Sequence, residues 1–175
     1  NATQPVEVEA EKYISTEEGK EVKNAKEAIA GAKDIIAERI ADVADYRTYI
    51  RDITFKEGNL VSTAKDKEAE SVYEMYYEYS EPISAIPGHR ILAINRGEAE
   101  KFITVKISAP QERIFVYLQK QLITSDNEFT TPIIKEVIED SYSRLIAPAI
   151  EREIRSSLTE KAEDGAIKVF GKNLE

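Results

Sequence analysis

The chain has 175 residues, 42% hydrophobic and 33% charged, with a formal net charge of −9 and a pI of about 4.9. This length can bury a core, and no apolar run reaches the roughly 20 residues that a membrane-spanning helix needs. The chain has no cysteine, which excludes disulfides, thiolate metal ligands and cysteine nucleophiles and is typical of a reducing compartment such as the cytoplasm. The negative charge disfavours a whole-surface attraction to nucleic acid or to a membrane.

The first part of the chain is acidic. Residues 1–21 contain six Glu and two Lys, a local charge of −4, and few large apolar side chains. We expect an acidic lead-in over 1–21, in which Asn1 and Ala2 are the remnant of a cleaved tag. The sequence is then an excised piece of a longer protein.

Two helices are predicted next, over residues 24–43 and 45–58. Asn24 is an N-cap residue with Glu27 at the capping-box position, and apolar residues follow at helical spacing. Gly58 is the expected stop of the second helix.

The following segments are predicted as a short extended run over 59–64 and a helix over 65–79. Pro82 ends this helix, because the residue before a proline disfavours the α conformation. One face of the predicted helix carries tyrosines, namely Tyr73, Tyr76 and Tyr77. We expect these rings in the core rather than as a platform for stacked bases, because glutamates and not basic residues are interleaved with them.

A β-hairpin is predicted near 90–108. Residues 90–95 are rich in β-forming side chains, 96–101 form the turn, and 102–108 alternate polar and apolar residues with period two. Residues 22–130 thus form a helical region that contains the hairpin.

The last part of the chain, residues 131–175, is predicted to be helical throughout. Thr131 is expected to cap a helix with its hydroxyl, and Pro132 is expected at its first position. Pro110 is likewise expected at the start of a separate helix over 111–123. Pro148 is expected to kink the helix or to start a new one. A stripe at steps of four contains Ile146, Ile150, Ile154, Leu158 and Ala162, and is continued by Ile167, Phe170 and Leu174. This terminal stripe packs either on earlier helices or on a domain outside the sequence.

The fold class is therefore mainly α (α+β), a helical domain with a small antiparallel β element and long C-terminal helices.

Catalysis is not indicated by the sequence. A single histidine and no cysteine leave few nucleophile–base pairs, and no common hydrolase, metalloprotease or phosphate-loop motif is present. Adjacent carboxylates such as Glu139 and Asp140 point about 100° apart on a helix. We expect no enzyme activity, no catalytic or metal-binding residue, no cofactor and no small-molecule substrate.

The candidate nucleic-acid contacts are His89, Arg90 and Arg96. As parts of one strand, Arg90 and Arg96 would lie about 20 Å apart, too far to hold one phosphate but suited to successive ones. The alternative is structural: Arg90 forms an ion pair with Glu81, because arginine favours a bidentate pairing with a carboxylate.

Lys65 and Lys67 are the second cationic candidates. With Arg51 and Lys56 upstream, they lie where a helix gives way to a loop, a common place for phosphate contacts. Asp66 and Glu68 balance them, so ordinary solvated lysines are the alternative.

Five strings, in this order, resemble the bacterial Tex family of transcription accessory proteins: AKDIIAERIAD, FKEGNLVSTAKDKE, YYEYSEPISAIPGHRILAINRGEAEK, RLIAPAIEREIR and AIKVFGKNLE. The resemblance covers nearly the whole chain from residue 20 onward. Its most specific patterns are SEP…P.HR.LA..RGE and RL..P..E.E.R.

The resemblance implies a helical N-terminal region that precedes an RNase H-like domain, helix-hairpin-helix elements and an S1 domain, all outside this sequence. Nucleic-acid binding in the family is attributed chiefly to the S1 and helix-hairpin-helix parts. The resemblance supplies no catalytic residue here. Our first hypothesis is a non-enzymatic scaffold that positions these domains and adds weak RNA or DNA contacts. The second is a protein-interaction module that docks on the transcription machinery through acidic and tyrosine-rich faces.

Overall fold

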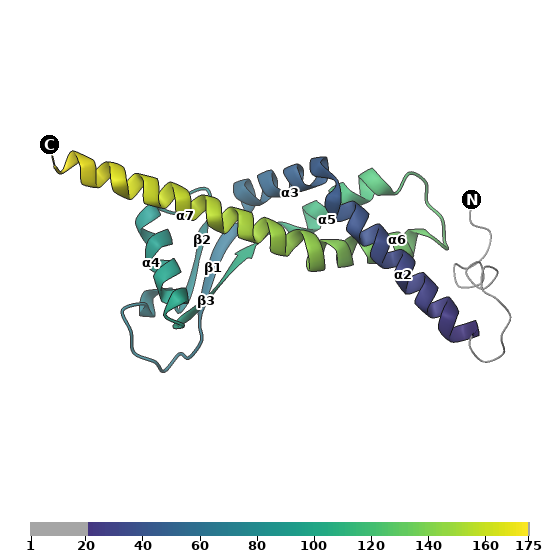
Figure 1. Cartoon of the computed structure of the whole chain (residues 1–175), viewed down its shortest axis with the longest axis horizontal. Helices are drawn as coiled ribbons and strands as arrows, with labels where there is room; N and C mark the ends of the chain where they lie inside the picture. The colour runs from purple at the N-terminus through teal and green to yellow at the C-terminus, as the bar shows by residue number, and fades with distance from the viewer. Residues whose placement is uncertain (1–20, 175) are drawn as a thin grey trace. The chain divides into compact units, whose positions relative to one another are not determined.

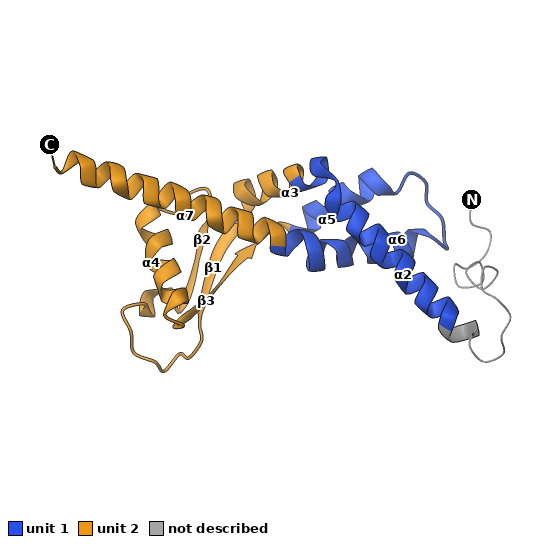
Figure 2. Ribbon diagram, in the orientation of Figure 1, with its two compact units in different colours: residues 1–47, 111–148 blue, residues 48–110, 149–175 orange. Residues whose placement is uncertain are grey.

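The computed structural model describes residues 21–174, in two compact units (Figure 2). Within the described residues, the helical unit comprises 21–47 and 111–148, and the sheet unit comprises 48–110 and 149–174. The fold class is as predicted, mainly helical with a small antiparallel sheet. The expected acidic lead-in and tag remnant lie outside the described residues, apart from Glu21.

The helical unit contains α2 (Glu21–Asp42), α5 (Gln111–Leu122) and α6 (Thr131–Asp140), followed by the π-helical segment η2 (Ser141–Ile146). The helices predicted over 24–43 and 111–123 are confirmed by α2 and α5. The capping role expected of Thr131 is wrong. The residue at the cap position is Thr130, and Thr131 Oγ1 instead accepts a hydrogen bond from Asn127 N at 2.9 Å.

The core of the helical unit includes a close contact between α2 and η2. Ser141 Oγ donates to Ala37 O at 2.6 Å, and both residues are fully buried. Small side chains at both positions allow this approach of the two backbones, while the rings of Phe115 and Tyr142 pack edge to face at 5.3 Å.

Helix α7 (Ala147–Lys172) begins directly after η2. In the π-helical turn, Ala147 N donates to Tyr142 O, five residues back. A new α-helix thus starts one residue before Pro148. This position is expected for proline, because the N–H groups of the first helical turn have no partner within the helix.

The sheet unit is built on three antiparallel strands in the order β2-β1-β3 (Figure 1). Helix α3 (Ala44–Glu57) leads through Gly58 into the central strand β1 (Asn59–Ala64), which confirms the predicted second helix and extended run. Strands β2 (Glu78–Pro82) and β3 (Ile103–Ser108) flank β1.

Helix α4 (Gly88–Ala99) connects β2 to β3, so that the order β2-α4-β3 encloses β1 as a split β-α-β unit. Ile103 and Val105 of β3 are buried and Lys106 is exposed, which confirms the period-two prediction for this strand.

The predicted first strand of the hairpin is wrong, because residues 90–95 lie in α4. The segment carries β-forming side chains, but its buried residues Ile91, Ile94 and Gly97 recur at steps of three, which is a helical period. Gly97, expected in a turn, is buried within the helix: a Cβ there would lie 3.0 Å from Cδ1 of Tyr73 and 3.1 Å from Cδ1 of Ile103.

The helix predicted over 65–79 is also wrong. The segment is irregular, with one 3₁₀ turn over Glu74–Tyr76 before β2 begins. Side chains satisfy the backbone groups that a helix would use: Asp66 Oδ1 accepts from Glu68 N, and Ser71 Oγ accepts from Tyr73 N. Pro82 closes the edge strand β2, where a missing N–H is tolerated.

The tyrosine prediction is confirmed for two rings even though the helix is absent. Tyr73 and Tyr76 are buried, and Tyr77 is half-buried with its hydroxyl donating to Ala69 O at 2.7 Å. The structure therefore offers no tyrosine-rich face at this segment.

The first part of the predicted C-terminal stripe is confirmed as core, since Ile146, Ile150, Ile154, Leu158 and Ala162 are all buried. The continuation differs. Ile167, Phe170 and Leu174 are exposed, so within the described residues they do not fold back on earlier helices.

Candidate functional site

The predicted cationic residues His89 and Arg90 lie in the first turn of α4. On a helix, Arg90 and Arg96 are about 9 Å apart along the axis, so the strand-based separation of about 20 Å is wrong. His89 and Arg96 are exposed and two turns apart.

Arg90 is engaged inside the sheet unit, where it joins α4 to β2. Its Nη1 donates to both carboxylate oxygens of Glu81 at 3.1 Å and to the Tyr79 hydroxyl at 3.2 Å. The Tyr79 hydroxyl also donates to Glu81. The predicted partner of Arg90 is therefore correct.

The electrostatics of this triad are mutually reinforcing. The hydrogen bond from Tyr79, supported by Arg90, holds the pKa of Glu81 below its usual value. Burial and the bond to Glu81 raise the pKa of Tyr79. The bond to Glu81 raises the pKa of Arg90, so the pair stays ionised at neutral pH.

Lys65 and Arg96 lie at the other end of α4. Lys65 N donates to Phe102 O at 3.0 Å, and the Phe102 ring packs on Tyr73. A hydrogen bond with Glu100 raises the pKa of Tyr73.

Lys67 follows Lys65 in the exposed turn after β1. In the two segments, 65–70 and 96–101, the cations Lys65, Lys67, Arg96 and Lys101 are accompanied by the carboxylates Asp66, Glu68, Glu70, Glu98 and Glu100. The structure thus divides the five candidate residues between two ends of α4, and the end with the lysines has no local excess of positive charge.

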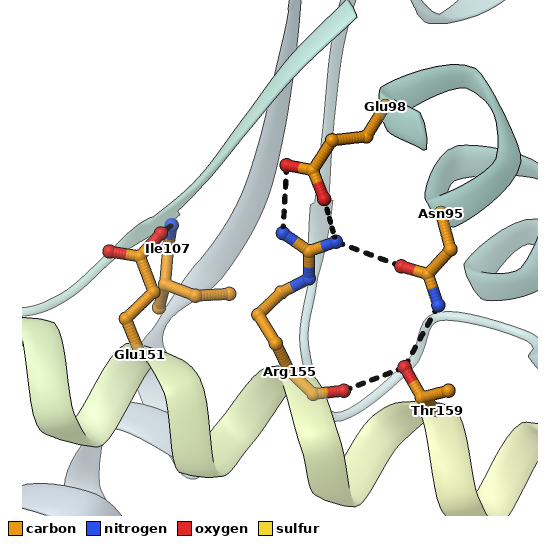
Figure 3. Close-up of polar contacts among 6 residues, drawn as sticks. All are labelled: Asn95, Glu98, Ile107, Glu151, Arg155 and Thr159. Carbon is orange, nitrogen blue, oxygen red and sulfur yellow. Dashed lines mark hydrogen bonds and ion pairs between the residues drawn. The ribbon is translucent and has the colours of Figure 1, made fainter. Parts of the chain in front are cut away.

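A second polar cluster, which we call the clasp, joins α4 to α7 (Figure 3). Arg155 donates to Glu98 through two nitrogens, at 2.8 and 3.3 Å, and to Asn95 Oδ1 at 2.8 Å. Asn95 Nδ2 donates to Thr159 Oγ1 at 2.8 Å, and this hydroxyl donates to Arg155 O. Arg155, Asn95 and Thr159 thus close a ring of hydrogen bonds through the Arg155 carbonyl, and Glu98 holds the guanidinium from the other side.

One turn before Arg155, α7 makes a further polar contact with the sheet. Glu151 Oε1 accepts a hydrogen bond from Ile107 N of β3 at 3.1 Å. The pair is drawn beside the clasp in Figure 3.

Sequence reasoning did not single out the clasp residues, although a signal for them was present. The string GHRILAINRGE contains Asn95 and Glu98, and RLIAPAIEREIR contains Glu151 and Arg155. The two strings that carry the family resemblance therefore meet in space at the clasp, and what they share is a structural contact between two helices.

Among residues 21–174, no three His, Asp or Glu side chains are grouped so as to hold a metal ion. None of the described helices is long and apolar enough to cross a membrane.

The sheet unit also contains an apolar groove of about 610 Å³. It lies between the segment before α4, the first turns of α4 and the second half of α7. His89, one of the predicted nucleic-acid contacts, lines this groove, whereas Arg96 does not.

Comparison with known proteins gives the family. Residues 1–170 match the family described as Tex central region-like. YdcI of Bacillus subtilis is 51% identical over 168 residues, covering 94% of this chain and 23% of the relative. Protein tex of Bordetella pertussis is 30% identical, covering 94% of this chain and 22% of the relative. The human S1 RNA-binding domain-containing protein 1 is 32% identical, and the match covers 82% of this chain and 16% of the relative. The chain thus spans less than a quarter of the length of these relatives, and it belongs to the Tex family as a Tex central region-like segment.

Proposed function

We propose that this segment is a non-enzymatic scaffold within a cytoplasmic Tex-type transcription accessory protein, where it positions the parts that bind nucleic acid. The observation that carries the proposal is the clasp. A half-buried arginine, an amide, a carboxylate and a hydroxyl are all used to fix α7 against α4, and a helix held in this way keeps whatever is attached to it in a defined direction.

The names of the relatives support a role near nucleic acid. One is called tex, another a transcriptional accessory protein, and a third is named for an S1 RNA-binding domain. In our proposal this chain's longer polypeptide binds RNA or DNA mainly outside the matched span, because Arg90 is paired and the other predicted contact residues are accompanied by carboxylates.

Direct nucleic-acid contacts by this segment are proposed as weak at most. Arg90 is committed to Glu81 and Tyr79, which leaves His89, Arg96, Lys65 and Lys67 as the candidates. A chain of net charge −9 has little long-range attraction for a polyanion.

The second candidate function is a protein-interaction module that docks on the transcription machinery. The apolar groove is the observation that favours it. The tyrosine cluster does not, because Tyr73 and Tyr76 are buried.

The test is fluorescence anisotropy with labelled single-stranded RNA, single-stranded DNA and duplex DNA, at low and physiological salt. The chain alone is compared with the same sequence in a polypeptide of the relatives' full length. We expect saturable binding only for the long form, with an affinity that falls when Arg155→Ala loosens the clasp. Equal binding by the short chain would contradict the scaffold proposal, as would metal-dependent nuclease activity of the short chain.

A further inference from the structure

The groove in the sheet unit owes its shape to one close helix contact. A Cβ on Gly88, the first residue of α4, would lie 3.2 Å from the Cα of Ala162 on α7. The two helices therefore touch through their smallest residues. The second half of α7 continues beyond this point, and Gly165 and Ala166 add no bulk to the groove.

The walls of the groove are apolar and open. Ile91 and Leu92 of α4 line one side, and Val169 and Phe170 of α7 line the other. Val169 is 62% exposed and Phe170 68% exposed, although Ala162 and Leu158, about two and three turns earlier on the same helix, are core. Large apolar side chains on both walls of a groove are typical of a site that receives another apolar surface.

One edge of the groove carries lysines. His89 and Lys161 line it, and Lys168 and Lys172 follow Lys161 at steps of seven and four, which keeps them on nearly the same side of α7. Past Asp164, the described part of α7 carries no acidic residue. These lysines favour an occupant that carries acidic residues along the side that faces this edge.

The dimensions fit a helix. The lining residues of α7 extend from Leu158 to Asn173, about 22 Å at the helical rise. That length accommodates about four turns of an amphipathic helix, which lays its apolar face into a groove and presents flanking charges to the rim.

A second copy of this chain is a poor occupant. The exposed apolar residues at the end of α7 are accompanied by Lys168 and Lys172. A copy docking through that end would bring these lysines to a rim that is already cationic, and like charges at an interface oppose association.

We infer that the groove holds an amphipathic helix with acidic flanks from elsewhere in the same polypeptide, an inference that rests on the proposed role as one segment of a longer Tex-type protein. The matched relative YdcI is more than four times as long as the matched span. A groove of this size binds a separate partner weakly, but a tethered helix is present at millimolar effective concentration. Docking of this helix is what orients the remaining domains against the end of α7.

The absence of cysteine in the chain allows a direct measurement. Val169→Cys places a thiol in the groove and Asp164→Cys places one on α7 outside it. Maleimide labelling rates are compared between the chain alone and a polypeptide of the relatives' full length, after melting curves confirm that both variants fold. We expect at least tenfold slower labelling at position 169 in the long form, with rates at position 164 within twofold. Equal rates at position 169 would overturn the inference.

The identity of the occupant is tested by zero-length carbodiimide crosslinking, which joins lysine amines to carboxylates. We expect Lys161, Lys168 or Lys172 to be linked within one polypeptide to acidic residues outside this sequence. Links only between two copies, or no links, would overturn the assignment.

Charge reversal by Lys161→Glu with Lys168→Glu should restore fast labelling at position 169 in the long form. Unchanged protection would show that the acidic flank is wrong. Nucleic-acid anisotropy on the same samples separates this inference from the scaffold proposal, because binding can persist when protection of the groove is lost.

Discussion

Arg155 of α7 and Glu98 of α4, 57 residues apart in the sequence, form a two-point ion pair with N–O distances of 2.8 and 3.3 Å. Arg155 also donates to Asn95, which donates to Thr159, so the arginine cannot turn away without breaking a further bond. This contact decides where the second half of α7 points relative to the sheet.

Arg155→Ala should lower the free energy of unfolding by about 1–3 kcal/mol, because it leaves Asn95 and the partly buried Glu98 without their donor. Urea denaturation followed by circular dichroism measures the change. Arg152→Ala, an exposed arginine on the same helix, is the matched control and should change stability by less than about 0.5 kcal/mol. Equal effects of the two substitutions would argue against the clasp.

Two isoleucines on α7 should respond in opposite ways to truncation. Ile154 is fully buried, so Ile154→Ala should cost about 2–5 kcal/mol. Ile167 is 69% exposed, and Ile167→Ala should leave the melting temperature of this chain nearly unchanged. A large loss from Ile167→Ala would show that the end of the helix is packed in solution.

Gly58 and Gly31 form a matched pair for added methyl groups. A Cβ at Gly58 would lie 2.4 Å from Thr54 O and 3.0 Å from Ser108 O, so Gly58→Ala must displace backbone and should cost about 1–3 kcal/mol. Nothing lies within 4 Å of a Cβ at Gly31 in α2. Gly31→Ala should therefore raise the free energy of unfolding by about 0.5–1 kcal/mol, because alanine has the higher helix propensity. Thermal melts of the two variants should shift in opposite directions.

The stability of the sheet unit should depend on acidic pH through Glu81. Its pKa is lowered in the folded state from an ordinary value of 4.5, chiefly by the hydrogen bond from Tyr79 and then by Arg90. The ionised form is thus favoured by folding, and its contribution is complete above the unfolded pKa and lost as the pH falls through the folded one. Glu81→Gln should destabilise the chain at pH 7, and this deficit should shrink as the pH falls below the unfolded pKa and vanish below the folded pKa of Glu81. Glu139→Gln, at an exposed position, serves as the control in denaturant titrations across this range.

The predicted nucleic-acid contacts can be separated by paired measurements of stability and binding. Arg90→Ala should lower stability, because it removes the partner of Glu81 and Tyr79. The triple variant Lys65→Ala, Lys67→Ala, Arg96→Ala should leave stability within about 0.5 kcal/mol. A drop in RNA or DNA affinity of this triple variant at low salt would establish a direct contact surface, whereas unchanged affinity would assign recognition to other parts of the protein.

The long helices and strand β3 were predictable because their patterns are uniform. Residues of α2 and α7 repeat apolar side chains at helical spacing, and β3 alternates strictly, so local and tertiary preferences agree. Segments 65–79 and 90–95 were not predictable in this way, since helix-forming residues surround buried tyrosines in one and β-forming residues occupy a helix in the other. Packing against the sheet, through Tyr73 and Gly97, decided both cases.

The candidate site was only partly predictable for a related reason. The Arg90–Glu81 pair followed from proximity in the sequence and from the chemistry of arginine. The clasp needed knowledge of how α7 approaches α4, which no local pattern contains. The outcome for Phe170 depends on whether a helix end meets another surface, and that is decided outside the segment.

The bond from Ile107 N to Glu151 has a consequence for solubility. Strand β3 is at the edge of a three-stranded sheet, and edge strands with unused N–H groups recruit strands from other molecules. A carboxylate from α7 occupies one of these donors and places a negative charge beside the strand. Helix α7 therefore covers part of this sheet edge, and we expect detachment of α7 to open the edge of β3 to intermolecular pairing.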